Sequence, residues 1–153
     1  MTQAQDFHNS FVLIHMSGKR FAVPASRVAE LSPPVRLHTF PHTTALVSGV
    51  IVRRGKIIPV CNANALFGGK RSSANLFYLV AECGSSSSPE LLAIPVNGES
   101  ELASGGVRPP EESSPGYIAG ILSAGEESIG VLDLAALAGA VNASQSPAPE
   151  VLS

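Results

Sequence analysis

The sequence predicts an all-β fold made of two similar halves, each with about five strands and able to close into a small barrel. Three observations support this prediction. Short apolar runs rich in β-branched residues recur along the chain, and clusters of Gly, Pro and Ser divide them at near-regular spacing. Two pairs of segments repeat at one common spacing. Helical patterns are short and few.

The repeat relates residues 21–31 to 92–102 and residues 49–68 to 120–139. The offset between the two members is the same for both pairs, so the stretch between the two blocks is equally long in each copy. Ordered agreement at one spacing indicates two like-folded halves. Features that the copies share then belong to the architecture, and features that differ are candidates for function.

Five apolar runs in each half are predicted to form strands. They are residues 11–16, 21–23, 35–37, 46–52 and 57–61 in the first half, and 76–81, 91–96, 101–106, 117–122 and 128–132 in the second. Pro59 and Pro95 lie inside such runs. Because proline cannot donate a ladder hydrogen bond, we expect their strands at sheet edges or bulges.

The domain organisation follows from the repeat and from the segments between the strands. Short helical segments are predicted at residues 26–31, 63–67 and 134–141. A flexible hairpin loop is expected at 84–89. We expect one domain over residues 9–141, with a first lobe at about 9–70 and a second at about 74–141. Residues 142–153 lack an apolar period and contain two prolines, so a disordered tail is expected there.

The composition of the chain limits its class and its partners. A length of 153 residues fits a single domain, and 44% hydrophobic residues supply a core. Charged residues make up 14% and the formal net charge is −2, which disfavours nucleic acid as a partner. No run of about 18 apolar residues predicts membrane insertion, and the start of the chain does not resemble a signal peptide. We therefore expect a cytoplasmic protein.

Few residues are candidates for chemistry. Cys61 and Cys83 are too few for a disulfide framework, and Cys61 lies in an apolar run typical of a core thiol. His38 and His42 are separated by Pro41 in an extended stretch, so we expect no metal site there. We predict no catalytic residues, no metal and no cofactor. Two alternatives stay open, namely an enzyme with Cys61 as nucleophile and a small-barrel nucleic-acid-binding module.

Two further polar positions fit helix caps. Asp133 follows a predicted strand and precedes a helical segment, which is typical of a helix N-cap, and its counterpart in the first copy is Asn62.

The largest difference between the two copies lies at one predicted hairpin tip. Residues 53–56 read Arg-Arg-Gly-Lys, whereas the equivalent residues 124–127 read Ala-Gly-Glu-Glu. Gly55 is expected to supply the turn, because a tight hairpin often needs a positive φ. Since the second copy folds without an arginine here, Arg54 is predicted to serve an interaction. Arginine suits interfaces because its planar fork binds carboxylates with two nitrogens.

These residues resemble the CheW-like coupling domains of chemotaxis, over roughly residues 10–141. The typical pattern of that family is Gly-Val-x-Asn-Leu-Arg-Gly-x-Ile-x-Pro-Val-x-Asp-Leu, and residues 49–63 read GVIVRRGKIIPVCNA. The upstream segment FAVPASRVAEL is similar to the family's aliphatic-Pro segment with Val-x-Glu. Val52, Arg53 and Asn62 depart from the pattern, where the family has Asn, Leu and Asp. The added positive charge at Arg53 is expected to affect partner choice.

The resemblance implies two SH3-like five-stranded barrels and a non-enzymatic adaptor. It implies two partners, the regulatory domain of a CheA-type histidine kinase and the cytoplasmic tips of chemoreceptors. Carried over to this chain, Val28 and Arg54 are the expected contact residues, and Gly49 and Gly55 shape the backbone. The full set of predicted protein-binding residues is Val28, Gly49, Val50, Arg53, Arg54, Gly55 and Lys56.

Overall fold

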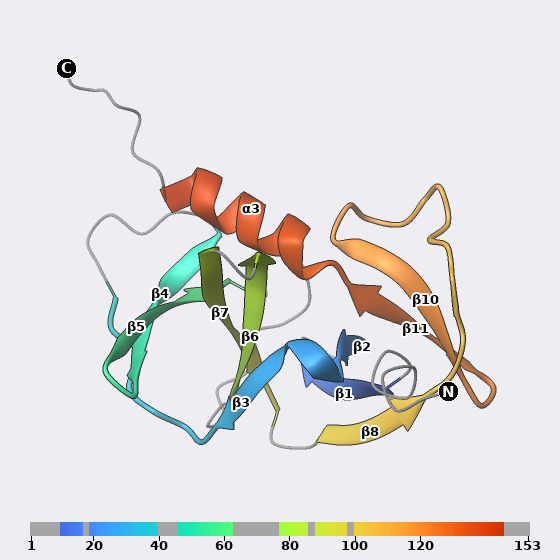
Figure 1. The fold of residues 1–153 in the computed structure, drawn as a ribbon, viewed down its shortest axis with the longest axis horizontal. Coiled ribbons are helices and arrows are strands. Elements are labelled where there is room, and N and C mark those ends of the chain that lie inside the picture. Colours follow the sequence, from blue (N-terminus) through green and yellow to red (C-terminus); the bar gives the residue numbers. More distant parts are fainter. Residues whose placement is uncertain are drawn as a thin grey trace.

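The computed structural model describes residues 10–16, 19–39, 46–62, 77–85, 88–97 and 100–145. Two β-sheets lie side by side, and one helix, α3, lies over the sheet that contains β4, β6 and β7 (Figure 1). The first sheet has the strand order β8-β1-β2-β11-β10-β9, and the second has the order β3-β6-β7-β5-β4. This is the predicted all-β class with two similar halves.

Some consecutive strands pair as hairpins, among them β1–β2, β4–β5, β6–β7 and β10–β11, whereas β3 and β8 pair with strands distant in the chain. The bounds of the elements are β1 Ser10–Met16, β2 Lys19–Pro24, a 3₁₀ turn Ala25–Arg27, β3 Val28–Ser32, β4 Val47–Arg53, β5 Lys56–Cys61, β6 Phe77–Ser85, β7 Ser88–Val96, β8 Ser100–Ser104, β9 Val107–Arg108, β10 Ile118–Ala124, β11 Glu127–Leu132 and α3 Leu134–Gln145.

The two sheets exchange strands between the halves of the sequence. The hairpin β1–β2 pairs with β11 of the second half, and the hairpin β6–β7 pairs with β5 of the first half. The predicted lobes, 9–70 and 74–141, therefore do not coincide with the two sheets. The physical reason is that the chain leaves the first sheet after β2 and returns to it at β8, so each sheet needs strands from both copies.

The internal repeat is visible in the pairing of the strands. The run β8-β1-β2-β11-β10 of the first sheet corresponds through the repeat to β3-β6-β7-β5-β4, which is the strand order of the second sheet. The parallel pairs Val60↔Ala93 and Val131↔Ala22 are equivalent in the two sheets. A register irregularity follows Val47 in β4, and another occurs at the equivalent place in β10. The predicted repeat is thus confirmed, although its units interlock.

Three apolar clusters of described residues form the core. Each sheet encloses one cluster, and the members of the two correspond through the repeat: Phe11 and Tyr78, Leu13 and Val80, Ala22 and Ala93, Leu122 and Ile51, Ile129 and Ile58, Val131 and Val60. The third and largest cluster joins both sheets and includes Leu134, Leu137 and Ala138 of α3. Burial of this shared cluster stabilises the two sheets as one unit.

The structure corrects two expectations near β3. Residues 28–32 form a strand that pairs with β6, whereas a helical turn was expected at 26–31; only Ala25–Arg27 is helical. Tertiary pairing with β6 overrides the weak local helix preference. Residues 35–37 do not form the expected strand, and His38 instead makes an isolated backbone bridge with Val50 of β4.

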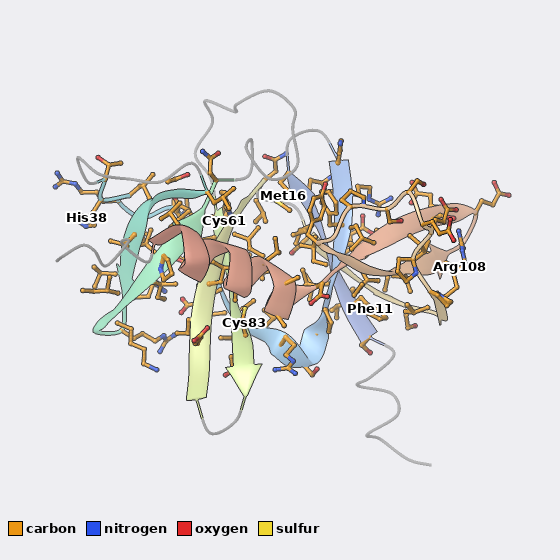
Figure 2. The ribbon with its side chains drawn as sticks, turned by 90° about the horizontal axis from the view of Figure 1, so that it is seen from above. Phe11, Met16, His38, Cys61, Cys83 and Arg108 are labelled. Atoms are coloured by element: carbon orange, nitrogen blue, oxygen red, sulfur yellow. The ribbon has the colours of Figure 1, made fainter. Side chains whose placement is uncertain are left out.

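Two loop expectations in the second half also need correction. The strands β6 and β7 extend until Ser85 pairs with Ser88, so residues 84, 85, 88 and 89 of the expected loop belong to strands, and the other two lie outside the described residues. Residues 101–106 contribute β8, which ends at Ser104, and the short strand β9 at Val107–Arg108 was not predicted. Figure 2 shows Arg108 and His38 near opposite ends of the molecule, as expected for equivalent edge positions.

The prolines were expected at sheet edges or bulges, and neither lies in an edge strand, although Pro59 is next to the register irregularity between β4 and β5. Pro59 belongs to β5 and Pro95 to β7, and both strands are interior. The pairing between β5 and β7 is limited to Val60 and Ala93. Because the ladder between these strands is so short, few donors are needed and both prolines are tolerated.

The helix α3 begins as predicted and continues further. The backbone N–H of Ala136 donates to a side-chain oxygen of Asp133 at 3.0 Å, which confirms Asp133 as the N-cap. The helix ends at Gln145, so residues 142–145 of the expected tail are helical. The predicted helix at 63–67 lies outside the described residues.

Candidate protein-interaction site

The candidate site is the tip of the β4–β5 hairpin. Arg53 pairs with Lys56 across the strands, and Arg54 and Gly55 form the tight turn between them. Both turn residues have positive φ, 53° for Arg54 and 76° for Gly55. This is the backbone of a type I′ turn, which matches the twist of the flanking strands. Gly55 was predicted in this role, and Arg54 shares it.

Glu30 of β3 lies against this tip and joins both arginines. Its Oε2 accepts hydrogen bonds from Nε of Arg53 at 3.0 Å and from a terminal nitrogen of the same guanidinium. Its Oε1 lies 3.4 Å from Nε of Arg54. The side chains of Glu30 and Arg53 are 17% and 24% exposed, whereas that of Arg54 is 79% exposed. One carboxylate thus holds one arginine firmly and a second one loosely.

The electrostatics of Glu30 agree with this arrangement. The hydrogen bonds from Arg53 lower the pKa of the Glu30 carboxyl, with further lowering by the charges of Arg53 and Arg54, against a smaller opposing effect of burial. The carboxylate therefore stays ionised. The tip carries three cations, Arg53, Arg54 and Lys56, and this one counter-charge contacts two of them.

The second copy carries the inverse arrangement at the same place. Glu101 is the counterpart of Glu30 in the repeat, and it pairs with Arg20 of β2 at 3.5 Å. Arg20 also pairs with Glu127, which stands where Lys56 stands in the first copy. In one sheet a carboxylate holds two cations, and in the other a cation holds two carboxylates. The predicted contrast between a basic and an acidic tip therefore extends to the residues beneath each tip.

The outward face below the tip is apolar only in the first copy. Val52 and Ile57 form a cross-strand pair and are 49% and 72% exposed. The equivalent pair in the second copy is Ser123 and Ser128. Exposed apolar pairs beside a charged tip are typical of protein interfaces. The first hairpin thus offers a surface that the architecture alone does not require.

The remaining predicted site residues lie close to the hairpin in the chain but differ in accessibility. Gly49 is buried in β4, where a Cβ would stand 2.3 Å from the carbonyl oxygen of His38. Val50 is half-buried and bridges to His38 through the backbone. Val28 lies just before Glu30 in the same strand, and its side chain packs on the central cluster.

Glu30 was not among the predicted contact residues. The signal that could have found it was present, because Glu30 is the acidic residue of the Val-x-Glu segment. Its partners Arg53 and Arg54, however, belong to a different hairpin and meet it only through the curvature of the sheet.

The residues weighed for catalysis are buried or structural. Cys61 and Cys83 are free thiols of the central cluster (Figure 2). Burial raises the pKa of Cys61 to about 12 and that of Cys83 to about 11, so both thiols are protonated at neutral pH. A thiolate nucleophile at Cys61 is thereby disfavoured. Across the described residues, His, Cys, Asp and Glu side chains form no group of three that could hold a metal ion; His42 lies outside them.

Comparison with known proteins agrees with the fold. Residues 10–142 match the family of CheW-like domains. The chain belongs to this family. The match spans both sheets and most of α3, so nearly all of the described structure is included. The assignment supports a scaffold role in chemotaxis.

Solved structures contain the same CheW-like fold. The scaffolding protein TtCheW from Thermoanaerobacter tengcongensis superposes with a TM-score of 0.75 and 21% sequence identity, over 84% of this chain and 86% of that one. No curated protein matches the sequence. Within the described residues, no helix has the length and apolar character needed to cross a membrane.

Proposed function

We propose that this CheW-like domain is a non-enzymatic cytoplasmic adaptor that couples chemoreceptors to a CheA-type histidine kinase. In this proposal the tip of the β4–β5 hairpin is the receptor contact, with Arg54 at its centre. A separate, mostly apolar sheet edge binds the regulatory domain of the kinase. The protein then acts by holding its two partners in a fixed relative position.

The conformation of Arg54 carries the proposal. A non-glycine residue with positive φ has an unfavourable backbone, and among the described residues Arg54 is the only one. The equivalent residue of the second hairpin is Gly125, with a φ of 63°. Glycine would therefore satisfy this turn at lower cost. An arginine with a 79% exposed side chain at such a position supports a role in binding a partner.

The surroundings of Arg54 indicate the chemistry of that partner. The same hairpin carries a cross-strand pair of exposed aliphatic side chains, Val52 and Ile57. A matching surface presents a carboxylate or a carbonyl oxygen next to an apolar side chain. The interface is expected to be small, with a total buried surface near about 1,200 Å², which is the lower limit for stable protein–protein interfaces.

Calorimetric titration tests the proposal. The purified chain is titrated with the regulatory domain of the kinase from the same cell, and separately with a soluble fragment of a receptor cytoplasmic tip. Saturable binding of both is expected. Arg54→Gly is expected to weaken receptor binding about tenfold or more, as for interface arginines in general, and to leave kinase binding unchanged.

Glu126→Ala is the matched control, because Glu126 occupies the turn of the second hairpin. It is expected to leave receptor binding unchanged. A folded wild-type chain that binds neither partner contradicts the adaptor proposal. Normal receptor binding by Arg54→Gly contradicts only the assignment of Arg54.

A further inference from the structure

Two guanidinium groups share one carboxylate at the β4–β5 tip. Arg53 takes Oε2 of Glu30 with two of its nitrogens, and Arg54 approaches Oε1 with one nitrogen at 3.4 Å. Because a fork of two nitrogens on a carboxylate is stronger and more directional than a single contact, Arg53 is the preferred partner.

The backbone adds to this preference. Arg53 is the last residue of β4, so its side chain leaves an ordered strand, whereas Arg54 leaves from the turn. The exposed fractions, 24% for Arg53 and 79% for Arg54, show which of the two is fixed against the protein. An ion pair as exposed as that of Arg54 contributes little to stability.

We propose that Arg53 is a positioning residue that occupies Glu30 and thereby leaves Arg54 available to the carboxylate of a binding partner. This inference deepens the proposed function and rests on it. In the absence of Arg53, Glu30 would have Arg54 as its remaining arginine, and the partner would have to displace Glu30 before it could bind. Arg53 thus sets the affinity of the tip without touching the partner.

The first test needs no partner. Side-chain NMR of the free protein follows the Nε–Hε group of Arg54 in wild type and in Arg53→Leu. In wild type, exchange of this proton with water is expected to be fast and to respond only weakly to the titration of Glu30, whose Oε1 makes a single long contact with it. In Arg53→Leu, exchange is expected to slow and the signal to shift as Glu30 is protonated. An Arg54 signal that is the same in both proteins overturns the inference, whatever the binding results are.

The second test measures affinity for the receptor fragment. Arg53→Leu is expected to weaken binding roughly twofold to fivefold, which corresponds to the energy of one exposed ion pair. Adding Glu30→Gln to Arg53→Leu is expected to restore the wild-type affinity, because no carboxylate of this protein then competes with the carboxylate of the partner for Arg54. Arg53→Lys keeps the charge but has no fork, so an intermediate affinity is expected.

Net charge alone must be separated from positioning. Lys56→Leu removes the same charge from the same tip, and no ion pair joins Lys56 to Glu30, both of which are described residues. Glu30→Gln is expected to restore affinity in the Arg53→Leu background and not in the Lys56→Leu background. Equal restoration in both backgrounds means that only net charge matters and refutes the positioning role.

A wild-type chain that binds no receptor fragment refutes the proposed function, while the NMR test still decides whether Arg53 frees Arg54.

Discussion

Arg54 and Gly125 occupy the same turn position in the two hairpins of this protein, and both have left-handed backbones, with φ of 53° and 63°. The position demands a conformation that glycine adopts without penalty and that costs other residues roughly 1–2 kcal/mol. The second hairpin therefore closes without an arginine at this position. The two turns differ at the next residue, where Gly55 has a φ of 76° and Glu126 has no positive φ.

Arg54→Gly is predicted to fold with a free energy of unfolding within about 1 kcal/mol of the wild-type value, because relief of the backbone offsets the added chain entropy of glycine. Glu30 keeps its two hydrogen bonds from Arg53. Urea unfolding followed by circular dichroism measures the effect. Arg54→Val is the contrast, since a β-branched residue is poorly tolerated at positive φ, and it is predicted to lose about 1–2 kcal/mol. Equal losses in both variants would show that the Arg54 side chain itself stabilises the fold.

Gly49→Ala is predicted to destabilise the protein more than Gly120→Ala, although the two glycines are equivalent. A Cβ at Gly49 would meet the carbonyl oxygen of His38 at 2.3 Å, and this backbone atom can move only if the bridge to β4 breaks. A Cβ at Gly120 would meet a side-chain methyl of Val107 at 2.6 Å, and that exposed side chain can rotate away. Gly49→Ala should cost about 1–3 kcal/mol. Thermal unfolding of the two variants side by side decides the order.

The sequence was sufficient to predict the strands whose apolar pattern is strong, and the repeat, because equivalent residues keep their spacing. It could not show that the copies exchange hairpins. Val60 pairs with Ala93 of the other copy, and a periodic pattern contains no information about which of two similar strands is the partner. The segment at Val28–Ser32 was misassigned for a related reason, since its strand form depends on β6, which belongs to the other copy.

At the candidate site the sequence predicted the basic tip and missed its counter-ion. Arg53, Arg54 and Lys56 are close together in the chain and visible as a cluster. Glu30 joins them only in three dimensions, where it pairs with Arg53 and with the more exposed Arg54. The inverse cluster around Arg20 was also beyond prediction, because its partners Glu101 and Glu127 lie on two other strands.

Replacing Val52 and Ile57 by serine is predicted to leave stability nearly unchanged and to weaken receptor binding. Both side chains are largely exposed, so little apolar burial is lost on folding, and serine occupies the equivalent positions 123 and 128 of the second hairpin. The change can be measured by the same calorimetric titration as for Arg54. A double variant with unaltered receptor affinity would restrict the contact to the charged tip.

The buried thiol of Cys61 predicts how stability depends on pH. Burial raises the pKa of Cys61 from 9.0 to about 12 in the folded protein, whereas the unfolded chain keeps the ordinary value. Between these two values the unfolded state loses a proton that the folded state retains. The free energy of unfolding must then fall as the pH rises from 9 towards 12, and the contribution of Cys61 is fully present only below pH 9. For this one group the slope is about 1.4 kcal/mol per pH unit.

Urea unfolding at a series of pH values between about 8 and 11 measures this slope, and Cys61→Ala isolates the thiol. The alanine variant is predicted to be less stable at about pH 8, because it leaves a small cavity in the central cluster, and to lose stability more slowly as the pH rises. The pKa of Cys83 is raised as well, so part of the pH dependence remains in the Cys61→Ala variant.

A thiol-reactive probe gives an independent measurement at neutral pH, where Cys61 should be labelled only after denaturation. Rapid labelling of the native protein together with an unchanged slope in Cys61→Ala would mean that the thiol is accessible and ionised, and would return Cys61 to consideration as a nucleophile.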